Sequence, residues 1–435
     1  MPPSEPYSAV PSFWAATANP HTDLPRLTSD LETDVAIVGG GFTGLTTAHY
    51  LERSGVDCAV LEANDAGWGA SGRNGGMAVL RYKSGWSSLA EQVGLDTAQH
   101  MFRVLHDGID SLEATIAEYG IDCGFNRCGH VTAAHGPKPL AALAADVRWL
   151  EREMGYEGAA LLSRDEASRL IGSTEYVGAY LERRSGAIHP LNYARGLAAG
   201  VAKKVPVFAS SPVTGYRRDG SGFVLDTPSA RVRAKRIVVA TNAYTGLFPL
   251  PNDLARRIVP VPSNIIATEP LPAALAASVL PEGHVVTDTR RINLYFRLTP
   301  DRRMLFGSRG HLSGSNEPWA FEHIESAMCR VFPALRNTRV DYRWNGKVGF
   351  SLEYFPHYGE AEPGLFYGIG YSGRGVVLTH MVGKMLAAML RGEAADAGPI
   401  TRAAFRPIPL HAFHPLGIRL YTAYYRFLDA REQAR

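Results

Sequence analysis

Cysteine is scarce in this sequence, and its spacing matches no known motif. The four cysteines among 435 residues form no C-x-x-C pair, so we predict no disulfide framework and a reducing, cytoplasmic setting. The N-terminal residues lack the charged start and apolar core of a signal peptide. Cys123, Cys128, His130 and His135 could in principle bind zinc, but their spacing matches no usual zinc site, and we expect no bound metal.

Long apolar runs and a dominant charge are missing as well. No stretch reaches about 18 consecutive apolar residues, so we expect no transmembrane helix. The formal net charge of +3 is too small to argue for nucleic acid or a lipid surface as the partner. Neither observation distinguishes a monomer from a homo-oligomer.

The composition that is present is that of an ordinary globular protein. Apolar residues make up 46% of the chain and charged residues 20%. At 435 residues the chain exceeds the usual size of a single core, which predicts two domains.

The clearest motif is "DVAIVGGGFTGLTTAHYLERSGVDCAVLE", residues 34–62. Its apolar pattern predicts strand, helix and strand, a βαβ unit. Gly39, Gly41 and Gly44 form G-x-G-x-x-G: the first permits a tight turn, the second lets backbone approach a diphosphate, and the third packs helix on strand. Glu62 ends the second strand, where a carboxylate accepts hydrogen bonds from ribose and disfavours a 2′-phosphate. The unit therefore predicts a dinucleotide site at a helix N-terminus.

Two further glycine-rich stretches favour FAD over NAD. "GWGASGRNGG", residues 67–76, offers bare backbone with Arg73 and Asn74 as donors, although a flexible solvent loop would have a similar composition. "GIGYSGRG", residues 368–375, precedes a helix, but no second strand ending in an acid follows, so it is not a second dinucleotide site. A helix N-terminus aimed at the pyrimidine end of a flavin explains it better.

The ordered set of motifs carries a resemblance over nearly the whole chain. The set is "SFWAATANP", "DVAIVGGGFTGLTTAHYLERSG", "GWGASGRNGG", "SGAIHPLNYARGL", "WNGKVGFSLEYFPHYG" and "YGIGYSGRGVVLTHMVGKMLA". It resembles the D-amino-acid oxidase/glycine oxidase/sarcosine oxidase (DAO) family of flavoproteins, and within that family it is most similar to the γ-glutamylputrescine oxidase branch.

The resemblance implies an α/β fold with an α+β second domain. A discontinuous Rossmann-type FAD-binding domain would carry an antiparallel-sheet substrate domain over the flavin. We expect an N-terminal arm over 1–33, the FAD-binding domain over 34–88, 155–250 and 345–395, the substrate domain over 89–154 and 251–344, and a C-terminal helical tail over 396–435.

The motifs and the resemblance together predict the residues that bind FAD. The resemblance implies that Val213 contacts the adenine through its backbone and that the residues from Gly373 to Val376 lie along the pyrimidine edge of the flavin. The full predicted set is Gly39, Gly41, Phe42, Thr43, Gly44, Glu62, Ala63, Gly69, Ala70, Ser71, Arg73, Asn74, Gly75, Gly76, Met77, Val213, Ala240, Thr241, Asn242, Gly346, Gly370, Gly373, Arg374, Gly375 and Val376.

Three departures from the family pattern matter. Ser351 and Met77 stand where some relatives carry the Cys or His that links FAD, so we predict non-covalent FAD. Val348 aligns with the arginine that grips the substrate's α-carboxylate in glycine oxidase. Without an arginine that binds the α-carboxylate, a free α-amino acid is disfavoured as the substrate, and a primary or secondary amine is favoured.

The candidate substrate-pocket residues are Tyr295, Arg297, Trp344, Val348 and His357. Residues 291–310 are predicted to form a hairpin in which Tyr295 and Arg297 share one face. That face would either line the substrate cavity or form a solvated outer surface. His357 would contact the ring or serve only the structure. No residue is assigned as a catalytic acid or base.

The predicted chemistry follows from the cofactor. A neutral amine, such as a γ-glutamylputrescine-like or other N-substituted amine, would lose a hydride to flavin N5. The imine would hydrolyse, and O2 would reoxidise the flavin to give H2O2. The alternatives are an oxidase or dehydrogenase of glycine, sarcosine or a D-amino acid, a dehydrogenase that feeds a quinone, and a flavoprotein without turnover.

The C-terminal "PLGIRLYTAYYRFLDAR" has helical apolar spacing. Leu416, Leu420, Tyr424 and Leu428 fall on one helical face. That face could rest on a membrane, but we expect it to dock on the protein's own surface.

Overall fold

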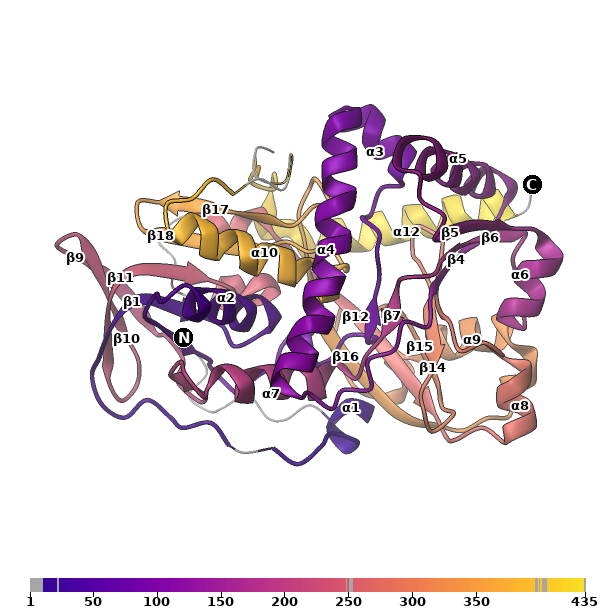
Figure 1. Ribbon diagram of the computed structural model, residues 1–435. Coiled ribbons are helices and arrows are strands. Elements are labelled where there is room, and N and C mark those ends of the chain that lie inside the picture. The colour runs from indigo at the N-terminus through magenta and orange to yellow at the C-terminus, as the bar shows by residue number, and fades with distance from the viewer. Residues whose placement is uncertain are drawn as a thin grey trace.

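Two large sheets occupy the two halves of the computed structural model (Figure 1). The structure describes residues 11–21, 23–247, 249, 253–395, 398, 400 and 405–433. Parts of the predicted N-terminal arm and C-terminal tail therefore lie outside the described residues.

The first sheet is built around the predicted βαβ unit. Its order is β17 (His357–Glu362), β18 (Leu365–Ile369), β11 (Arg231–Val239), β1 (Leu31–Val38), β2 (Cys58–Leu61) and β8 (Val207–Phe208), with β10 (Gly222–Asp226) and β9 (Gly215–Asp219) as an antiparallel ribbon on β11. The four central strands run parallel, with Val35 opposite Cys58. Ile37 and Val60 are fully buried, as expected for strands covered on both faces.

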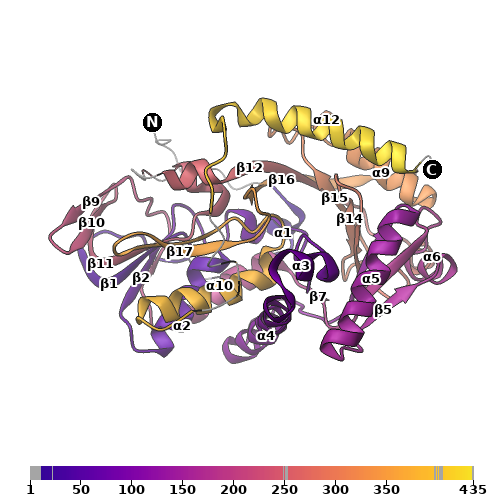
Figure 2. The ribbon, with the colours of Figure 1, turned by 90° about the horizontal axis from the view of Figure 1, so that it is seen from above.

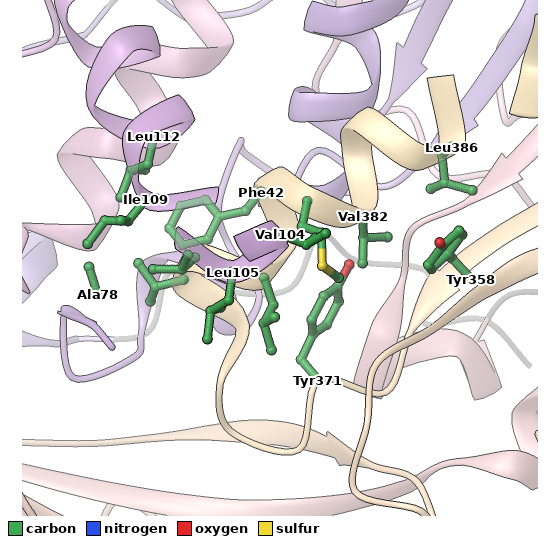
Figure 3. Close-up of a cluster of buried hydrophobic side chains, with 14 of the residues drawn as sticks. Phe42, Ala78, Val104, Leu105, Ile109, Leu112, Tyr358, Tyr371, Val382 and Leu386 are labelled. Atoms are coloured by element: carbon green, nitrogen blue, oxygen red, sulfur yellow. The ribbon is translucent and has the colours of Figure 1, made fainter. Parts of the chain in front are cut away.

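The helices α2 (Phe42–Arg53) and α10 (Gly375–Leu390) pack on this sheet, and outside them α4 (Leu95–Tyr119) packs on α10 and α7 (Pro190–Val201) packs on α2. Figure 3 shows Phe42 of α2, Leu105 of α4 and Val382 of α10 within one apolar cluster. A Cβ on Gly383 would lie 2.4 Å from Thr46 Oγ1, so only glycine lets α10 cross α2 this closely.

The second sheet has the order β16 (Val340–Phe350), β12 (Val259–Thr268), β15 (Met304–Arg309), β14 (Tyr295–Leu298), β13 (Val285–Asp288), β4 (His130–Ala134), β6 (Gly178–Glu182) and β5 (Ala159–Leu162). The predicted hairpin is realised as β14 and β15. The sheet is antiparallel, as expected, except that β13 and β4 pair in parallel.

Strand pairing corrects two of the expected segment assignments. β5 and β6 belong to the second sheet, although residues 155–182 were assigned to the FAD-binding domain. α4 packs on α7 and α10 of the first half, although residues 89–154 were assigned to the substrate domain. Pairing and packing between distant segments decide both cases, and local periodicity carries no information about them.

Further elements complete the layers. They are α1 (Phe13–Ala16), α3 (Trp86–Val93), α5 (Pro137–Met154), α6 (Arg164–Ile171), α8 (Ala273–Ser278), α9 (Glu322–Val331), α12 (His414–Gln433), and the short pair β3 (Met77–Ala78) and β7 (Gly186–Ala187). In the part of the chain that the structure describes, no helix combines the length and apolarity needed to cross a bilayer.

The C-terminal helix α12 lies along the outer side of the molecule (Figure 2). It docks on the protein as expected, but through the opposite face. Leu416, Leu420 and Tyr424 point to solvent, and Leu428 is only partly buried. Ile418 and Asp429 are buried instead. The docking face was wrongly predicted, because the face that docks combines Ile418 and Tyr421 with the acids Asp429 and Glu432, which pair with Arg291.

Candidate functional site

One cavity of about 1090 Å³ extends from the first sheet to the second. Gly39, Glu62 and Ala240, which follow β1, β2 and β11, line one end, while Tyr295 and Ser308 of the second sheet line the other. Ligands of open α/β sheets bind beyond the carboxyl ends of the strands. The volume lies at the upper end of the roughly 300–1,000 Å³ usual for ligand pockets, as a dinucleotide requires.

The first-sheet end is shaped by glycine. Gly39 has φ +115°, and a Cβ there would lie 2.8 Å from the Ala240 carbonyl oxygen. A Cβ on Gly41 would lie 2.9 Å from Ser71 Oγ, and one on Gly44 only 1.9 Å from the Gly39 carbonyl oxygen. Gly41, directly before α2, offers no side chain, and Ser71 Oγ accepts from Phe42 N, the first N–H of the helix, at 2.9 Å. The bare glycine backbone and the remaining N–H groups of this helix N-terminus fit a diphosphate.

Glu62 is held in place by two backbone donors. Gly40 N donates to one carboxylate oxygen at 2.6 Å, and Asn64 N donates to the other at 2.9 Å. Burial raises the pKa of Glu62, and these two hydrogen bonds oppose that rise. The fixed carboxylate lines the cavity, where it can accept hydrogen bonds from a ribose.

The glycine loop 67–76 uses its two polar side chains differently. Asn74 Nδ2 donates to the carbonyl oxygens of Ala70 and Ser71, and Asn74 Oδ1 accepts from Gly76 N at 2.8 Å. Asn74 therefore shapes its own loop, which corrects its expected role as a donor to the cofactor. Arg73 stacks over the Trp68 ring, and its second terminal nitrogen has no partner among the described residues. That buried guanidinium nitrogen is free for an anionic or carbonyl group of the cofactor.

Two buried tryptophans fix this loop from outside. Trp14 of α1 donates to the Asn74 carbonyl oxygen at 2.8 Å, and Trp344 of β16 donates to the Arg73 carbonyl oxygen at 2.9 Å. Sequence reasoning missed both roles. Trp14 lies in the quoted N-terminal motif, but only the fold shows that it reaches residue 74.

The N-terminus of α10 closes the middle of the cavity. Gly373, with φ +88°, and Arg374 line it directly before the helix, and no described side chain caps this helix. Burial, together with the nearby Arg81, lowers the pKa of Arg374 to about 10. A cation at a helix N-terminus fits the electron-rich pyrimidine end of a flavin.

Most of the predicted FAD-binding residues line the cavity; the exceptions are Gly44, Gly76 and Gly370. Gly44 packs α2 on β1, as predicted for the third glycine of the motif. Gly76 has φ +66° in a turn beside Ile188. Gly370 donates its N–H to Asn242 Oδ1 at 2.9 Å. The donors, bare backbone and space fit FAD.

The candidate substrate residues separate into two groups. Tyr295 and Val348 line the cavity, and a Cβ on Gly373 would lie 4.0 Å from Val348 Cγ1. Tyr295 shares a hydrogen bond of 2.8 Å with Ser263. Burial raises the pKa of Tyr295 well above its usual range.

For the other three candidates, the structure corrects the prediction that they line the substrate pocket. Arg297 is buried and donates to the carbonyl oxygens of Gly76 and Ile188 at 2.7 and 3.1 Å, so it braces backbone instead of lining the cavity. Trp344 is fully buried beneath the loop that it holds. His357 is buried against Phe405. Side-chain alternation placed Arg297 on the correct side of the strand, but the loop covers it.

Two cations that lie near the predicted Arg374 went unpredicted. Lys83, Arg309 and Arg374 all line the cavity. The Lys83 side chain is exposed to the cavity, and protein surrounds the cavity there. This burial within the protein, together with the positive charges of Arg374 and Arg309, lowers the pKa of Lys83 to about 8. Among the described lining residues, Glu62 at the far end is the only acid. Neither Lys83 nor Arg309 lies in a motif, so no sequence signal identified them.

The zinc alternative is not supported by the fold. Within the described ranges, the grouping of metal-ligating atoms joins His135 to Asp429 and Glu432, and it contains none of the cysteines. Arg291 bonds both of these carboxylates, at 2.9 and 2.8 Å, so a guanidinium already occupies the position of a cation.

Comparisons with known proteins agree with this geometry. The family model DAO, FAD dependent oxidoreductase, matches residues 34–389. The gamma-glutamylputrescine oxidoreductase of Escherichia coli (strain K12) is 35% identical over 400 residues, which cover 92% of this chain and 93% of that protein. A probable oxidoreductase, OrdL, of Haemophilus influenzae (strain ATCC 51907 / DSM 11121 / KW20 / Rd) is 33% identical and covers 97% of both chains.

Solved structures give the same fold. The glycine oxidase from Geobacillus kaustophilus superposes with a TM-score of 0.71 at 22% identity, covering 86% of this chain and 99% of that one. Identity this low supports the fold alone.

Proposed function

Since the chain belongs to the DAO family of FAD-dependent oxidoreductases, we propose that it oxidises the C–N bond of a primary or secondary amine that also carries a remote carboxylate. The membership confirms the family expected from the motifs, with FAD as the cofactor and an amine or amino-acid C–N bond as the target. A γ-glutamylated diamine has both of the proposed groups. The similarity to the gamma-glutamylputrescine oxidoreductase of Escherichia coli supports this choice.

The observation that carries the proposal is the charge of the cavity. Lys83, Arg309 and Arg374 line its middle and second-sheet end, and no described carboxylate lines that part; Asp288, outside the lining, offsets part of the positive charge at Lys83. Val348, beside Gly373, supplies no guanidinium for an α-carboxylate next to the reacting carbon. A substrate anion therefore finds its partners at Lys83 and Arg309, through charge-assisted hydrogen bonds.

The same charges select the protonation state of the substrate. Bound FAD supplies a two-electron acceptor, which takes a hydride from the carbon next to the amine nitrogen. An ammonium ion has no lone pair to assist that loss, so the amine must be neutral. Nearby positive charge disfavours the ammonium form of the amine. Lys83, Arg309 and Arg374 thus favour the reactive form without a general base.

The overall reaction balances with water and dioxygen. The amine loses two electrons and two protons to become an imine, and water hydrolyses the imine to a carbonyl compound and either ammonia, from a primary amine, or an amine, from a secondary one. Dioxygen takes up the two electrons and two protons and becomes hydrogen peroxide.

We propose that FAD is held without a covalent bond. Ser351 is buried and donates to the Phe355 carbonyl oxygen at 2.9 Å, while Met77 lines the cavity with neither the thiol of Cys nor the imidazole of His. Acid precipitation is expected to leave all flavin in the supernatant. Flavin in the washed pellet would contradict this assignment.

An α-amino-acid oxidase is the second candidate, because Lys83 and Arg309 could also hold an α-carboxylate. A peroxide-coupled assay separates the two candidates. It should include γ-glutamylated diamines, the same diamines without the glutamyl group, and glycine, sarcosine and D-alanine. The proposal predicts the highest kcat/KM for the γ-glutamylated amines. Preference for the small amino acids would favour the second candidate, and reduction of the flavin without peroxide would indicate a dehydrogenase.

A further inference from the structure

The C-terminal helix carries a stripe of large apolar side chains that face solvent. We define the outer stripe as Phe413, Leu416, Leu420, Tyr424 and Phe427. All five are more than half exposed, and Leu420 reaches 65%. Leu416, Leu420, Tyr424 and Phe427 are spaced three and four residues apart along one face of α12, and Phe413 lies in the turn directly before the helix.

Buried contacts on the opposite face hold this orientation. Asp429 and Glu432 both pair with Arg291, and Ile418 is buried. Tyr421 shares a hydrogen bond with Tyr354. These contacts act as a clamp, so the outer stripe is a fixed surface feature of the folded protein.

The charged residues of α12 are also divided between its inward and outward sides. Asp429 and Glu432 are the only acids between residues 405 and 433, and both point inward. Arg419, Arg426 and Arg431 are exposed, and none has an ion-pair partner among the described residues. The outward side of α12 is therefore apolar along its centre and positive along its flank.

We propose that α12 binds the surface of a bilayer that contains anionic lipids. The outer stripe would enter the boundary between headgroups and acyl chains, with the helix lying parallel to the membrane. The arginines would contact anionic headgroups, and the aromatic side chains suit the interfacial zone. This proposal does not depend on the substrate of the enzyme.

A second copy of the chain fits this surface less well. α12 runs along the outer edge of the molecule, a position that suits contact with a flat, deformable surface (Figure 2). An identical stripe would bring the same arginines and no outward acid to neutralise them. Like charges that approach without a partner oppose association.

The test uses purified holoprotein and sedimentation with vesicles. Vesicles of phosphatidylcholine alone are compared with vesicles that also contain phosphatidylglycerol. The variants are the pair Leu420→Glu/Phe427→Glu, the pair Arg419→Gln/Arg426→Gln, and the control Leu95→Glu, which changes an exposed leucine of α4. Flavin absorbance and circular dichroism confirm that each variant is folded.

The parent and the control should sediment with the phosphatidylglycerol vesicles, and the Glu pair should remain in solution. Each arginine removed should weaken binding about fivefold, and added salt should weaken binding of the parent. A parent that binds neither vesicle, or a Glu pair that binds like the parent, would overturn the proposal. Light scattering that shows a parent dimer, which the Glu pair abolishes, would also overturn it, because a second copy would then cover the stripe.

Discussion

The two ends of the cavity are built from different parts of the chain. At the first-sheet end, backbone and glycine form the surface, with Gly39, Gly41 and Glu62 inside one βαβ unit. At the second-sheet end, long side chains form the surface, and Lys83, Arg309 and Val348 come from three distant segments. A diphosphate is a constant group that backbone N–H groups can bind, whereas a substrate is recognised by side chains that vary among relatives.

The largest effect should follow from adding one carbon at the backbone end. In Gly44→Ala the new Cβ would overlap the Gly39 carbonyl oxygen, at 1.9 Å. We expect a loss of more than about 4 kcal/mol of stability and little protein with bound flavin. The measurements are the flavin-to-protein ratio and the melting temperature. Gly246→Ala is the control, because that glycine also lines the cavity and nothing lies within 4 Å of its added Cβ.

The second-largest effect should appear at the side-chain end without loss of flavin. Lys83→Met removes a charge-assisted contact worth about 1.5–3 kcal/mol, so kcat/KM for a carboxylated amine should fall roughly tenfold to a hundredfold. The matched amine without the carboxylate should lose little. Lys347→Met, at a lysine that lines the same cavity beside Tyr244, is the control. Equal losses for both amines would remove Lys83 from the anion site.

A moderate effect is expected at Glu62. Glu62→Gln keeps the shape and loses the charge that accepts hydrogen bonds from the ribose, so the Kd for FAD should rise about tenfold. The melting temperature of the FAD-free protein should fall, because one oxygen that accepts from Gly40 N or Asn64 N becomes a donor. Titration of apoprotein with FAD, followed by flavin fluorescence, measures the change. An unchanged Kd would show that the ribose does not rest on this carboxylate.

The smallest effect is a pH dependence of substrate choice. The pKa of Lys83, lowered to about 8, means that Lys83 loses its charge as the pH rises through that value. The ratio of kcat/KM for the carboxylated amine to that for its uncarboxylated match should therefore fall a few-fold from about pH 7 to about pH 9. Because both amines lose their own proton over this pH range, the ratio removes the effect of amine deprotonation on kcat/KM. It should stay flat in Lys83→Met, and a ratio that rises with pH would contradict the assignment.

The contrast between the two ends also explains which expectations succeeded. Strand, turn and helix around Gly39–Gly44 depend on neighbours within a few residues, so the pattern predicted them correctly. Arg297 shares a face with Tyr295 as predicted, but its guanidinium bonds the carbonyl oxygen of Gly76, 221 residues away in the chain. No periodicity reports such a contact.

The outward face of α12 is a second case of this kind. Its apolar spacing was evident, and only its direction was wrong. Arg291 lies in the segment before β14, and its pairing with Asp429 and Glu432 turns the acids inward and the leucines outward. The net charge of +3 concealed the positive flank, because a sum over the chain does not record which charges are buried.

By itself the sequence determined the dinucleotide motif, its acidic partner and the family, because glycine spacing and strand–helix alternation act over a few tens of residues. Only the tertiary structure decided which side chains face the cavity. It buried Arg297, Trp344 and His357, brought Lys83 and Arg309 together, and turned Leu420 to solvent. The direction of a side chain depends on what packs against it, and in this fold those partners come from strands and helices that are far away along the chain.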